Sequence, residues 1–433
     1  MSLHTRNSII NPKGEFRKRN FLFAGISILA LLFLTGYNGS QEVLCMENFV
    51  HDIPTKLYFG KGAISHLEEA LNHFGKKVLL VYGGGSIKKT GVYDAVMDIL
   101  SKGGFEVFEC PGVEPNPRIE SVKRGVDICK ENHVDVVLAV GGGSVIDCSK
   151  AICSGFYYEG DLWDMVKAGG SKSKALPLID ILTISATGSE FDSGGVISNM
   201  TTHEKLGASF CYPYASLLDP TYTYSVSRYQ TAAGSADIMS HIFEGYFSKT
   251  KDSELSDGIA ETILRTVIHN LPIALKEPDN YSARANLMSA SDVACSGIPE
   301  YGKVGTGWPV HMMEHELSAF YDITHGVGLA ILTPRVMRFI LKKDPGCAWR
   351  FVRFARNVWH LDGDDEMKLA LAGIEKLEKF FKDCGIPSSL HELGIGEEHF
   401  REMAEHANPG EYLLNSFVPL STDDIVEIYK MSL

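Results

Sequence analysis

Two stretches of this chain share the same three parts: a continuous apolar run, the tetrapeptide Gly-Gly-Gly-Ser, and a segment with helical spacing. The apolar runs are KKVLLVY, which ends before Gly83, and VDVVLAV, which ends before Gly141. Strands that are apolar on both faces are typical of a parallel sheet that is covered by helices on each side. Because such strands alternate with helices, we predict that the first half of the chain is α/β with right-handed crossovers.

The glycines that follow each strand also suggest a function. Glycine lets a phosphate approach the backbone, and the start of a helix offers free N–H groups. We expect Ser144 to cap the helix after the second loop. Neither loop matches the G-x-G-x-x-G pattern, so a tight turn without a ligand is the simpler explanation of either copy taken alone. A further strand in LPLIDILTI leads into a polar turn at 185–190 that suits a cofactor phosphate or amide.

The chain length and a change in secondary-structure pattern along the sequence indicate two domains. A chain of 433 residues is too long for one ordinary core. Strand patterns almost vanish after Thr231 and helical periodicity dominates to the end, so we place a boundary near Ser225. We therefore predict an α/β domain over 46–224 and a helical domain over 225–433. The net charge of −13 argues against a nucleic-acid surface, and nine cysteines without C-x-x-C spacing argue against a disulfide framework.

Residues 1–45 do not fit the α/β pattern. Basic residues precede an apolar run from Phe21 to Leu34, as in a signal peptide or a short membrane anchor. The run is shorter than the roughly 20 residues of a spanning helix. Either the segment is an anchor or export signal, or it is an upstream extension and the working protein begins at Met46. We favour the second explanation and expect a cytoplasmic protein, with membrane association only if the extension is real.

Aspartate and histidine residues recur at helical spacing in the second half. Asp237 and His241 are four residues apart, and His311 and His315 repeat that spacing. Side chains four apart lie on one helix face, one turn above the other. A carboxylate with several imidazoles is a set that divalent transition metals prefer. Any one of the 15 histidines is more simply explained as a structural residue; the repeated spacing favours a metal site.

The position of His325 predicts a break in the helix. It lies fourteen residues after His311, which is about 21 Å along a straight helix and too far to share an ion. The chain must therefore turn between them, and we predict that turn at 320–324. Thr324 is then expected to cap the next helix.

These features together resemble the iron-containing, group III alcohol dehydrogenases, in the butanol dehydrogenase-like branch. The resemblance is carried by GGGSVID at 141–147, ATGSE at 186–190, LLDPTYT at 217–223 and the two histidine-bearing segments, and it covers 46–433. It implies an amino-terminal dinucleotide-binding α/β domain with a parallel sheet, and an all-α carboxy-terminal metal-binding domain, in a dehydroquinate synthase-like fold. It also implies an active site in the cleft between them and a homodimer.

The resemblance implies roles for individual residues. The expected ligands of Fe²⁺, or next of Zn²⁺, are Asp237, His241, His311 and His325. His315 corresponds to a histidine near the nicotinamide, and we leave open whether it relays a proton or is structural. The positions expected to bind the cofactor are Gly83, Gly84, Ser86, Asn116, Gly142, Gly143, Ser144, Asp147, Thr183, Thr187, Asp192, Lys205 and Tyr224.

Cofactor choice is expected to depend on the first glycine loop. In NAD-preferring relatives an aspartate occupies the position that aligns with Gly84, where it accepts hydrogen bonds from the ribose 2′-OH and repels a 2′-phosphate. Here the loop offers glycine N–H groups and the Ser86 hydroxyl, with Lys88 and Lys89 just beyond. These groups suit a phosphate dianion. We therefore predict that NADP(H) is preferred over NAD(H).

The expected reaction is hydride transfer between this cofactor and a short- to medium-chain alcohol or aldehyde. Two other functions stay open at this point. One is a glycerol dehydrogenase-like or dehydroquinate synthase-like zinc enzyme on the same fold, and the other is a membrane-tethered binding protein without catalysis. The His311–His315–His325 pattern with ATGSE favours the alcohol dehydrogenase, and the intact ligand set argues against a mere binding protein.

Overall fold

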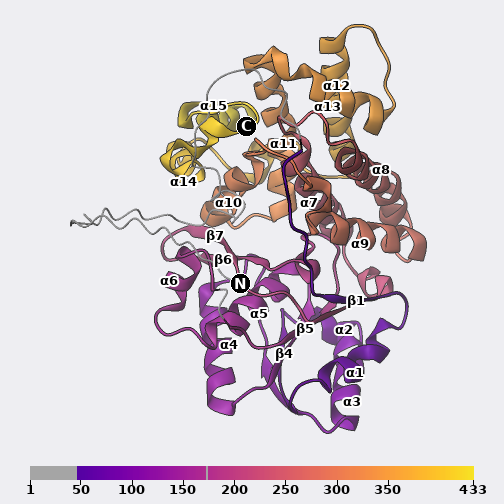
Figure 1. Cartoon of the computed structure of the whole chain (residues 1–433), viewed down its shortest axis with the longest axis vertical. Coiled ribbons are helices and arrows are strands. Elements are labelled where there is room, and N and C mark those ends of the chain that lie inside the picture. Colours follow the sequence, from indigo (N-terminus) through magenta and orange to yellow (C-terminus); the bar gives the residue numbers. More distant parts are fainter. Residues whose placement is uncertain (1–45, 172–173) are drawn as a thin grey trace, which may run out of the picture.

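The computed structural model describes residues 46–171 and 174–433. The chain forms an α/β half, indigo to magenta in Figure 1, and a helical half in orange and yellow. The predicted combination of a parallel-sheet α/β half and a helical half is confirmed. The apolar run at 21–34 lies outside the described residues; within them, no helix is long and apolar enough to cross a membrane.

The α/β half is built on a parallel sheet. Among the described residues six strands form it, in the order β1-β8-β5-β4-β2-β3. The strands are β1 (Lys56–Phe59), β2 (Lys77–Tyr82), β3 (Glu106–Cys110), β4 (Val136–Gly141), β5 (Leu178–Leu182) and β8 (Ala215–Leu218). The two apolar runs are the neighbours β2 and β4, paired from Val78 with Val136 to Tyr82 with Val140. Both Gly-Gly-Gly-Ser loops therefore leave the same edge of the sheet, side by side.

Helices cover both faces of this sheet, which explains the unbroken apolar runs. Leu79 and Val81 of β2 point into one core cluster, and Val78 and Leu80 point into the other. All four side chains are fully buried. The main helices over the first face are α4 (Ile119–Asn132) and α5 (Gly143–Gly155), and those over the second are α1 (Leu67–Leu71) and α3 (Val92–Lys102).

A two-stranded hairpin lies between the two halves (Figure 1). It pairs β6 (Gly194–Asn199) with β7 (Glu204–Ser209) in antiparallel register. Sequence periodicity did not reveal it, because GGVISN and EKLGAS contain glycine, small polar residues and little apolar alternation. The hairpin matters for the site, because Lys205 on β7 reaches into the helical half and pairs with Glu314.

The helical half has a core of its own, separate from the two clusters of the sheet. Its main helices are α7 (Arg228–Tyr246), α8 (Glu254–Lys276), α9 (Tyr281–Cys295), α10 (Val310–Tyr321), α11 (His325–Lys343), α12 (Ala348–Trp359), α13 (Glu366–Asp383), α14 (Phe400–Ala407) and α15 (Thr422–Met431). The predicted break between His311 and His325 is confirmed, because α10 ends at Tyr321 and α11 begins at His325. Asp322 closes α10 in the left-handed region, with φ of 49°.

Two details of helix capping differ from expectation. Thr324 is the residue before α11, but its side chain makes no capping hydrogen bond. The predicted Ser144 cap is wrong, because α5 begins at Gly143 and Gly142 occupies the capping position. Ser144 instead lies in the first turn of the helix.

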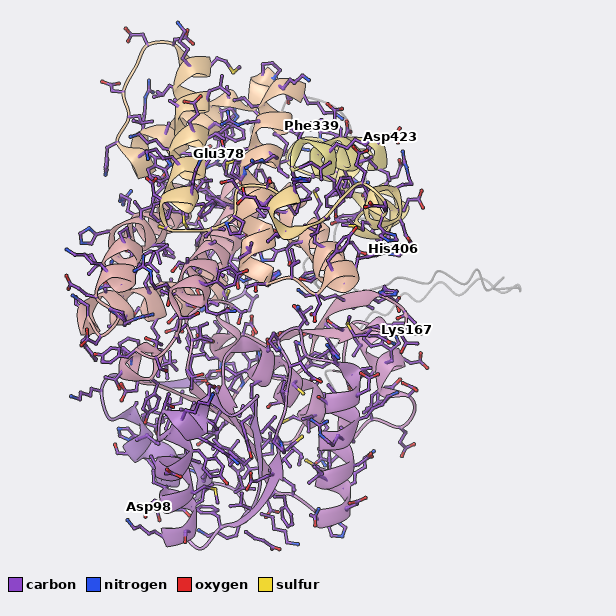
Figure 2. All side chains as sticks on the ribbon, turned by 180° about the vertical axis from the view of Figure 1, so that it is seen from behind. Asp98, Lys167, Phe339, Glu378, His406 and Asp423 are labelled. Atoms are coloured by element: carbon purple, nitrogen blue, oxygen red, sulfur yellow. The ribbon has the colours of Figure 1, made fainter. Side chains whose placement is uncertain are left out.

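The halves contact each other along a seam near the α10–α11 turn. The Asn116 amide donates to Oδ1 of Asp322 at 3.0 Å and to the carbonyl of Ile323 at 3.3 Å. On one side of this seam, Lys167 of the α/β half and His406 of the helical half are visible in Figure 2. The segment before β1 also follows the helical half: the N–H of Glu47 donates to Gly302, and the Phe49 ring stacks on Tyr301.

Candidate active site

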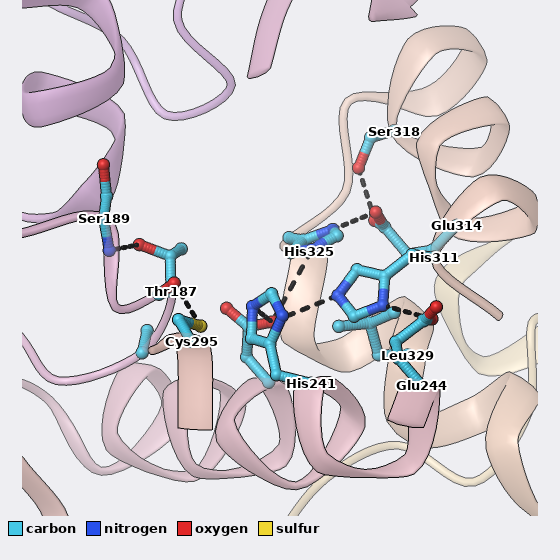
Figure 3. Close-up of polar contacts among 12 residues, drawn as sticks. Thr187, Ser189, His241, Glu244, Cys295, His311, Glu314, Ser318, His325 and Leu329 are labelled. Carbon is cyan, nitrogen blue, oxygen red and sulfur yellow. Dashed lines mark hydrogen bonds and ion pairs between the residues drawn. The ribbon is translucent and has the colours of Figure 1, made fainter. Parts of the chain in front are cut away.

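Four predicted metal ligands from three helices converge in the helical half. Asp237 and His241 come from α7, His311 from α10, and His325 is the first residue of α11. From Oδ1 of Asp237, the distance to Nε2 is 3.3 Å for His241, 3.7 Å for His311 and 3.7 Å for His325. In Figure 3 the three imidazoles turn these nitrogens toward a common centre.

The donor atoms at this centre fit a divalent metal ion. Oδ1 of Asp237, Nε2 of His241 and Nε2 of His311 are buried, yet they have no hydrogen-bond partner in the part of the chain that the structure describes. An unpaired buried polar atom costs about 1–3 kcal/mol. Three such atoms facing one point are explained by a ligand that uses their lone pairs. One carboxylate oxygen with imidazole nitrogens is a donor set for Fe²⁺ or Zn²⁺.

The electrostatics of the centre favour a cation. Burial by itself raises the pKa of Asp237, but His241 and His325 beside it hold that pKa well below its usual range. For His311, burial lowers the pKa, but the neighbouring carboxylates of Asp237 and Glu244 raise it to about 10. The carboxylate is therefore charged, and it draws positive charge onto its neighbours.

Two carboxylates that sequence reasoning missed hold the outer nitrogens of the histidines. Oε1 of Glu244 lies 2.8 Å from Nδ1 of His311, and Oε2 of Glu314 contacts Nδ1 of His325. Figure 3 joins each carboxylate to its histidine by a dashed line. Carboxylates in this position fix the ring orientation and the tautomer that leaves Nε2 free. The one available signal was their helical spacing, three residues after His241 and after His311.

His315 lies one turn beyond His311 on α10. It is buried, its ring centre is 5.7 Å from that of His325, and its Nδ1 has no hydrogen-bond partner among the described residues. Burial lowers the pKa of His315 well below 6.5, and the positive charges of Lys205 and His325 lower it further. His315 is therefore a neutral imidazole, with an unpartnered Nδ1, that lies next to the predicted metal ligand His325.

The second glycine loop is tightly packed. A Cβ at Gly142 would lie 2.2 Å from Ile184, and one at Gly143 would lie 2.2 Å from Oγ1 of Thr187. Both neighbours belong to the turn that follows β5. That turn starts at Thr183, whose N–H donates to the carbonyl of Gly141 at 2.9 Å. The predicted cofactor positions in the second glycine loop and in this turn thus form one continuous wall.

The first glycine loop is open. A Cβ at Gly84 would meet nothing within 4 Å, and only Gly85 requires glycine by its φ of 100°. Ser86 begins the short helix α2 (Ser86–Lys89) and is exposed. Next to the loop, Glu109 at the end of β3 accepts hydrogen bonds from Tyr82 and Tyr93. Sequence reasoning missed this carboxylate, because it comes from a different strand.

Asp147 and Asp192 are engaged inside the protein. Asp147 accepts hydrogen bonds from Oγ of Ser189 at 2.6 Å and from the N–H of Val196 at 2.8 Å. Burial raises its pKa to about 6. Asp192 accepts from the buried Lys150 at 2.6 Å. Both residues therefore hold the ATGSE turn and the hairpin against α5.

Three of the remaining predicted cofactor positions, Asn116, Tyr224 and Lys205, lie outside the two glycine loops. Asn116, with a left-handed φ of 54°, uses its amide to hold the α10–α11 turn. Tyr224 is half-buried directly after the short helix η4 (Pro220–Thr223). Lys205 is 5% exposed, and its Nζ lies 3.3 Å from both Glu314 and His325. Lys205 therefore directly contacts a predicted metal ligand, His325.

Comparison with known proteins agrees with this geometry. Residues 54–220 match the family model described as "Iron-containing alcohol dehydrogenase". Residues 231–433 match that described as "Fe-containing alcohol dehydrogenase family, C-terminal". These matches confirm the dehydroquinate synthase-like fold and favour the alcohol dehydrogenase over the glycerol dehydrogenase-like and non-enzymatic alternatives.

Individual relatives indicate the branch of this family to which the chain belongs. NADH-dependent butanol dehydrogenase A of Clostridium acetobutylicum is 51% identical over 392 residues, which cover 89% of this chain and 100% of the relative. The NADPH-dependent aldehyde reductase YqhD of Escherichia coli is 40% identical, covering 81% and 90%. The crystal structure of a butanol dehydrogenase A from Thermotoga maritima superposes with a TM-score of 0.84 at 41% identity, covering 90% and 99%. The chain therefore belongs to the iron-containing alcohol dehydrogenase family, in its butanol dehydrogenase-like branch, and is an NAD(P)-dependent alcohol dehydrogenase of the iron type.

Proposed function

We propose that this protein reduces short- to medium-chain aldehydes, and oxidises the corresponding alcohols, with NADP(H) and one divalent ion held by Asp237, His241, His311 and His325. The observation that supports this most strongly is the convergence of buried, unpaired donor atoms around Oδ1 of Asp237. Fe²⁺ is the expected ion and Zn²⁺ the next candidate. We place the cofactor in the cleft between an α/β domain of residues 46–224 and a helical domain of residues 225–433.

The side chains act mainly by positioning. A metal ion held there would supply positive charge that stabilises the negative charge developing on the substrate oxygen during hydride transfer. Asp237 and the three histidines fix where that charge lies, and the wall formed by Gly142, Gly143 and Thr187 sets the depth of the cofactor. We place Lys205 beside the nicotinamide ribose.

His315 is proposed to carry a proton between the substrate oxygen and solvent. Its neutral ring and unpartnered Nδ1 support this role. Replacing His315 with Asn should lower kcat for aldehyde reduction while the bound metal stays at the wild-type level. An unchanged kcat would assign His315 a structural role.

The NADP(H) preference is supported by the first glycine loop. No carboxylate occupies the loop itself, and Ser86 and Lys89 are exposed beside it. Lys88 is less available, because it lies over the Tyr93 ring and 3.9 Å from Glu109. The relatives differ in this property: the 51% identical butanol dehydrogenase is named NADH-dependent, and the 40% identical aldehyde reductase NADPH-dependent.

We also propose a homodimeric, cytoplasmic protein whose working part begins at Met46. β1 pairs with β8 alone among the described strands, and Leu57 and Phe59 are exposed on it. A second subunit would cover them. The match to the Clostridium relative covers 100% of that relative and 89% of this chain. Sedimentation of the purified chain tests the dimer; a monomer at micromolar concentration would contradict it.

One assay tests the proposed function as a whole. The protein is stripped of metal with a chelator, reloaded without oxygen with Fe²⁺ or with Zn²⁺, and given butanal with NADPH or NADH. We expect turnover only after reloading, and a higher kcat/KM with NADPH. Turnover by the stripped protein would contradict the metal role. A tenfold preference for NADH, about 1.4 kcal/mol, would contradict the cofactor assignment alone.

A further inference from the structure

One buried carboxylate connects the cofactor-binding half to the metal centre. Glu314 on α10 has no exposed surface. Its Oε2 contacts Nδ1 of His325 and lies 3.3 Å from Nζ of Lys205, which comes from β7 in the other half. Its Oε1 accepts the hydroxyl of Ser318. Among the described residues, by contrast, Glu244 receives a single donor, Nδ1 of His311, and makes no such contact with the α/β half.

Packing fixes Glu314 in this place. A Cβ at Gly328 would lie 2.8 Å from Cγ of Glu314, so the glycine on α11 makes room for the side chain. Lys205 and Glu314 are both almost wholly buried, and therefore their charges compensate each other inside the protein. The carboxylate is thus built into the contact between β7, α10 and α11.

The distances among the three groups suggest what Glu314 does. Nζ of Lys205 lies 3.3 Å from Nδ1 of His325, close enough to donate a hydrogen bond to that nitrogen. If it did, the ring proton of His325 would move to Nε2, the atom that faces Asp237. A nitrogen that carries a proton has no lone pair for a metal ion. Glu314 prevents this, because it accepts from Lys205 and also from a protonated Nδ1 of His325.

We propose that Glu314 is a positioning residue that keeps Lys205 from donating to His325, and so preserves the histidine tautomer that binds metal. The inference rests on the metal site proposed above. It gives the contact between the halves a second role. Lys205, which we place beside the cofactor, leaves the metal centre intact only while Glu314 accepts the hydrogen bond that His325 would otherwise accept.

Metal affinity of the stripped protein tests this without any assay of turnover. Co²⁺ is titrated into the full chain, and its visible absorption reports both affinity and coordination. Glu314→Ala should weaken Co²⁺ binding by about 10–100-fold, the usual effect of losing a carboxylate behind a ligating histidine. Adding Lys205→Met should restore affinity by about fivefold or more, because the competing donor is gone.

Two matched controls separate this effect from general damage. Glu316→Gln, two residues along the same helix, removes a carboxylate that pairs with His406 instead, and should leave Co²⁺ affinity unchanged. Glu244→Ala should weaken binding, but Lys205→Met should not rescue it. If Glu314→Ala does not fold, as judged by circular dichroism, Glu314→Gln replaces it in both the single and the double variant.

The outcomes separate the two proposals. A wild-type chain that binds no Co²⁺ would overturn the metal site and the role of Glu314 together. A wild-type chain that binds, with Glu314→Ala binding equally tightly, would overturn only the role of Glu314. If Glu314→Ala weakens Co²⁺ binding and Lys205→Met does not restore it, the role of Glu314 is also overturned. The carboxylate would then act on His325 independently of Lys205.

Discussion

The two Gly-Gly-Gly-Ser loops are identical in sequence and leave neighbouring strands at the same edge of the sheet, yet they differ in what surrounds them. In the second loop, Cβ atoms at Gly142 and Gly143 would lie 2.2 Å from Ile184 and Thr187. In the first loop, a Cβ at Gly84 would meet nothing within 4 Å. The second loop thus needs glycine for packing, whereas the first has room for a side chain. We infer that the second sets where the cofactor lies and the first sets which cofactor is chosen.

The largest effect is expected from filling the tight loop. Gly143→Ala places a methyl group against Thr187, which should cost about 1–3 kcal/mol in unfolding free energy and at least tenfold in dinucleotide affinity. Thermal unfolding and fluorescence titration with NADPH measure the two effects separately. Wild-type affinity in this variant would remove the contrast between the loops.

Filling the open loop should change selectivity without loss of stability. Gly84→Asp has space for its side chain, so the unfolding free energy should stay within about 0.5 kcal/mol of wild type. Its carboxylate should repel a 2′-phosphate and accept from a ribose hydroxyl, shifting the kcat/KM ratio toward NADH by about tenfold or more. Gly84→Asn is the uncharged control and should shift the ratio less. Equal shifts in both variants would exclude charge as the cause.

A smaller effect separates the two lysines beside the open loop. Lys89 is exposed, whereas Lys88 lies over Tyr93 and near Glu109. Lys89→Ala should lower kcat/KM with NADPH by about threefold and leave NADH unaffected, because a surface charge contributes at most about 1 kcal/mol. Added salt should shrink the difference. A larger effect from Lys88→Ala would mean that its contacts rearrange when the cofactor binds.

No change is expected from removing residues 1–45. A chain that starts at Met46 keeps the hydrogen bond from Glu47 to Gly302 and the stacking of Phe49 on Tyr301. Its metal content, its kcat/KM with each cofactor and the ratio of kcat/KM between NADPH and NADH should match those of the full chain. An insoluble or inactive truncated chain would show that the extension takes part in folding or function.

The sequence predicted those features that depend on local pattern. The apolar runs became β2 and β4, and the distance from His311 to His325 required the break between α10 and α11. The contrast between the glycine loops was not predictable, because it depends on Ile184 and Thr187, some forty residues beyond the second loop.

The supporting carboxylates were missed for a similar reason. Glu244 and Glu314 look like ordinary helical charges in the sequence, and only the folded chain shows that they face Nδ1 of His311 and His325. The hairpin that carries Lys205 to Glu314 has too little apolar alternation to be recognised. Contacts between distant segments, and not local propensity, complete the site.

The most direct test of the whole account is the metal content of His311→Ala. His311 faces Asp237 at 3.7 Å, and His406 on α14 is a matched control that pairs with Glu316 instead. After loading with Fe²⁺ without oxygen, followed by desalting, elemental analysis should find one ion per chain in the wild type and in His406→Ala. His311→Ala should keep little metal and almost no turnover, with an unchanged circular dichroism spectrum. A folded His311→Ala that retains one ion per chain would contradict the assigned metal centre.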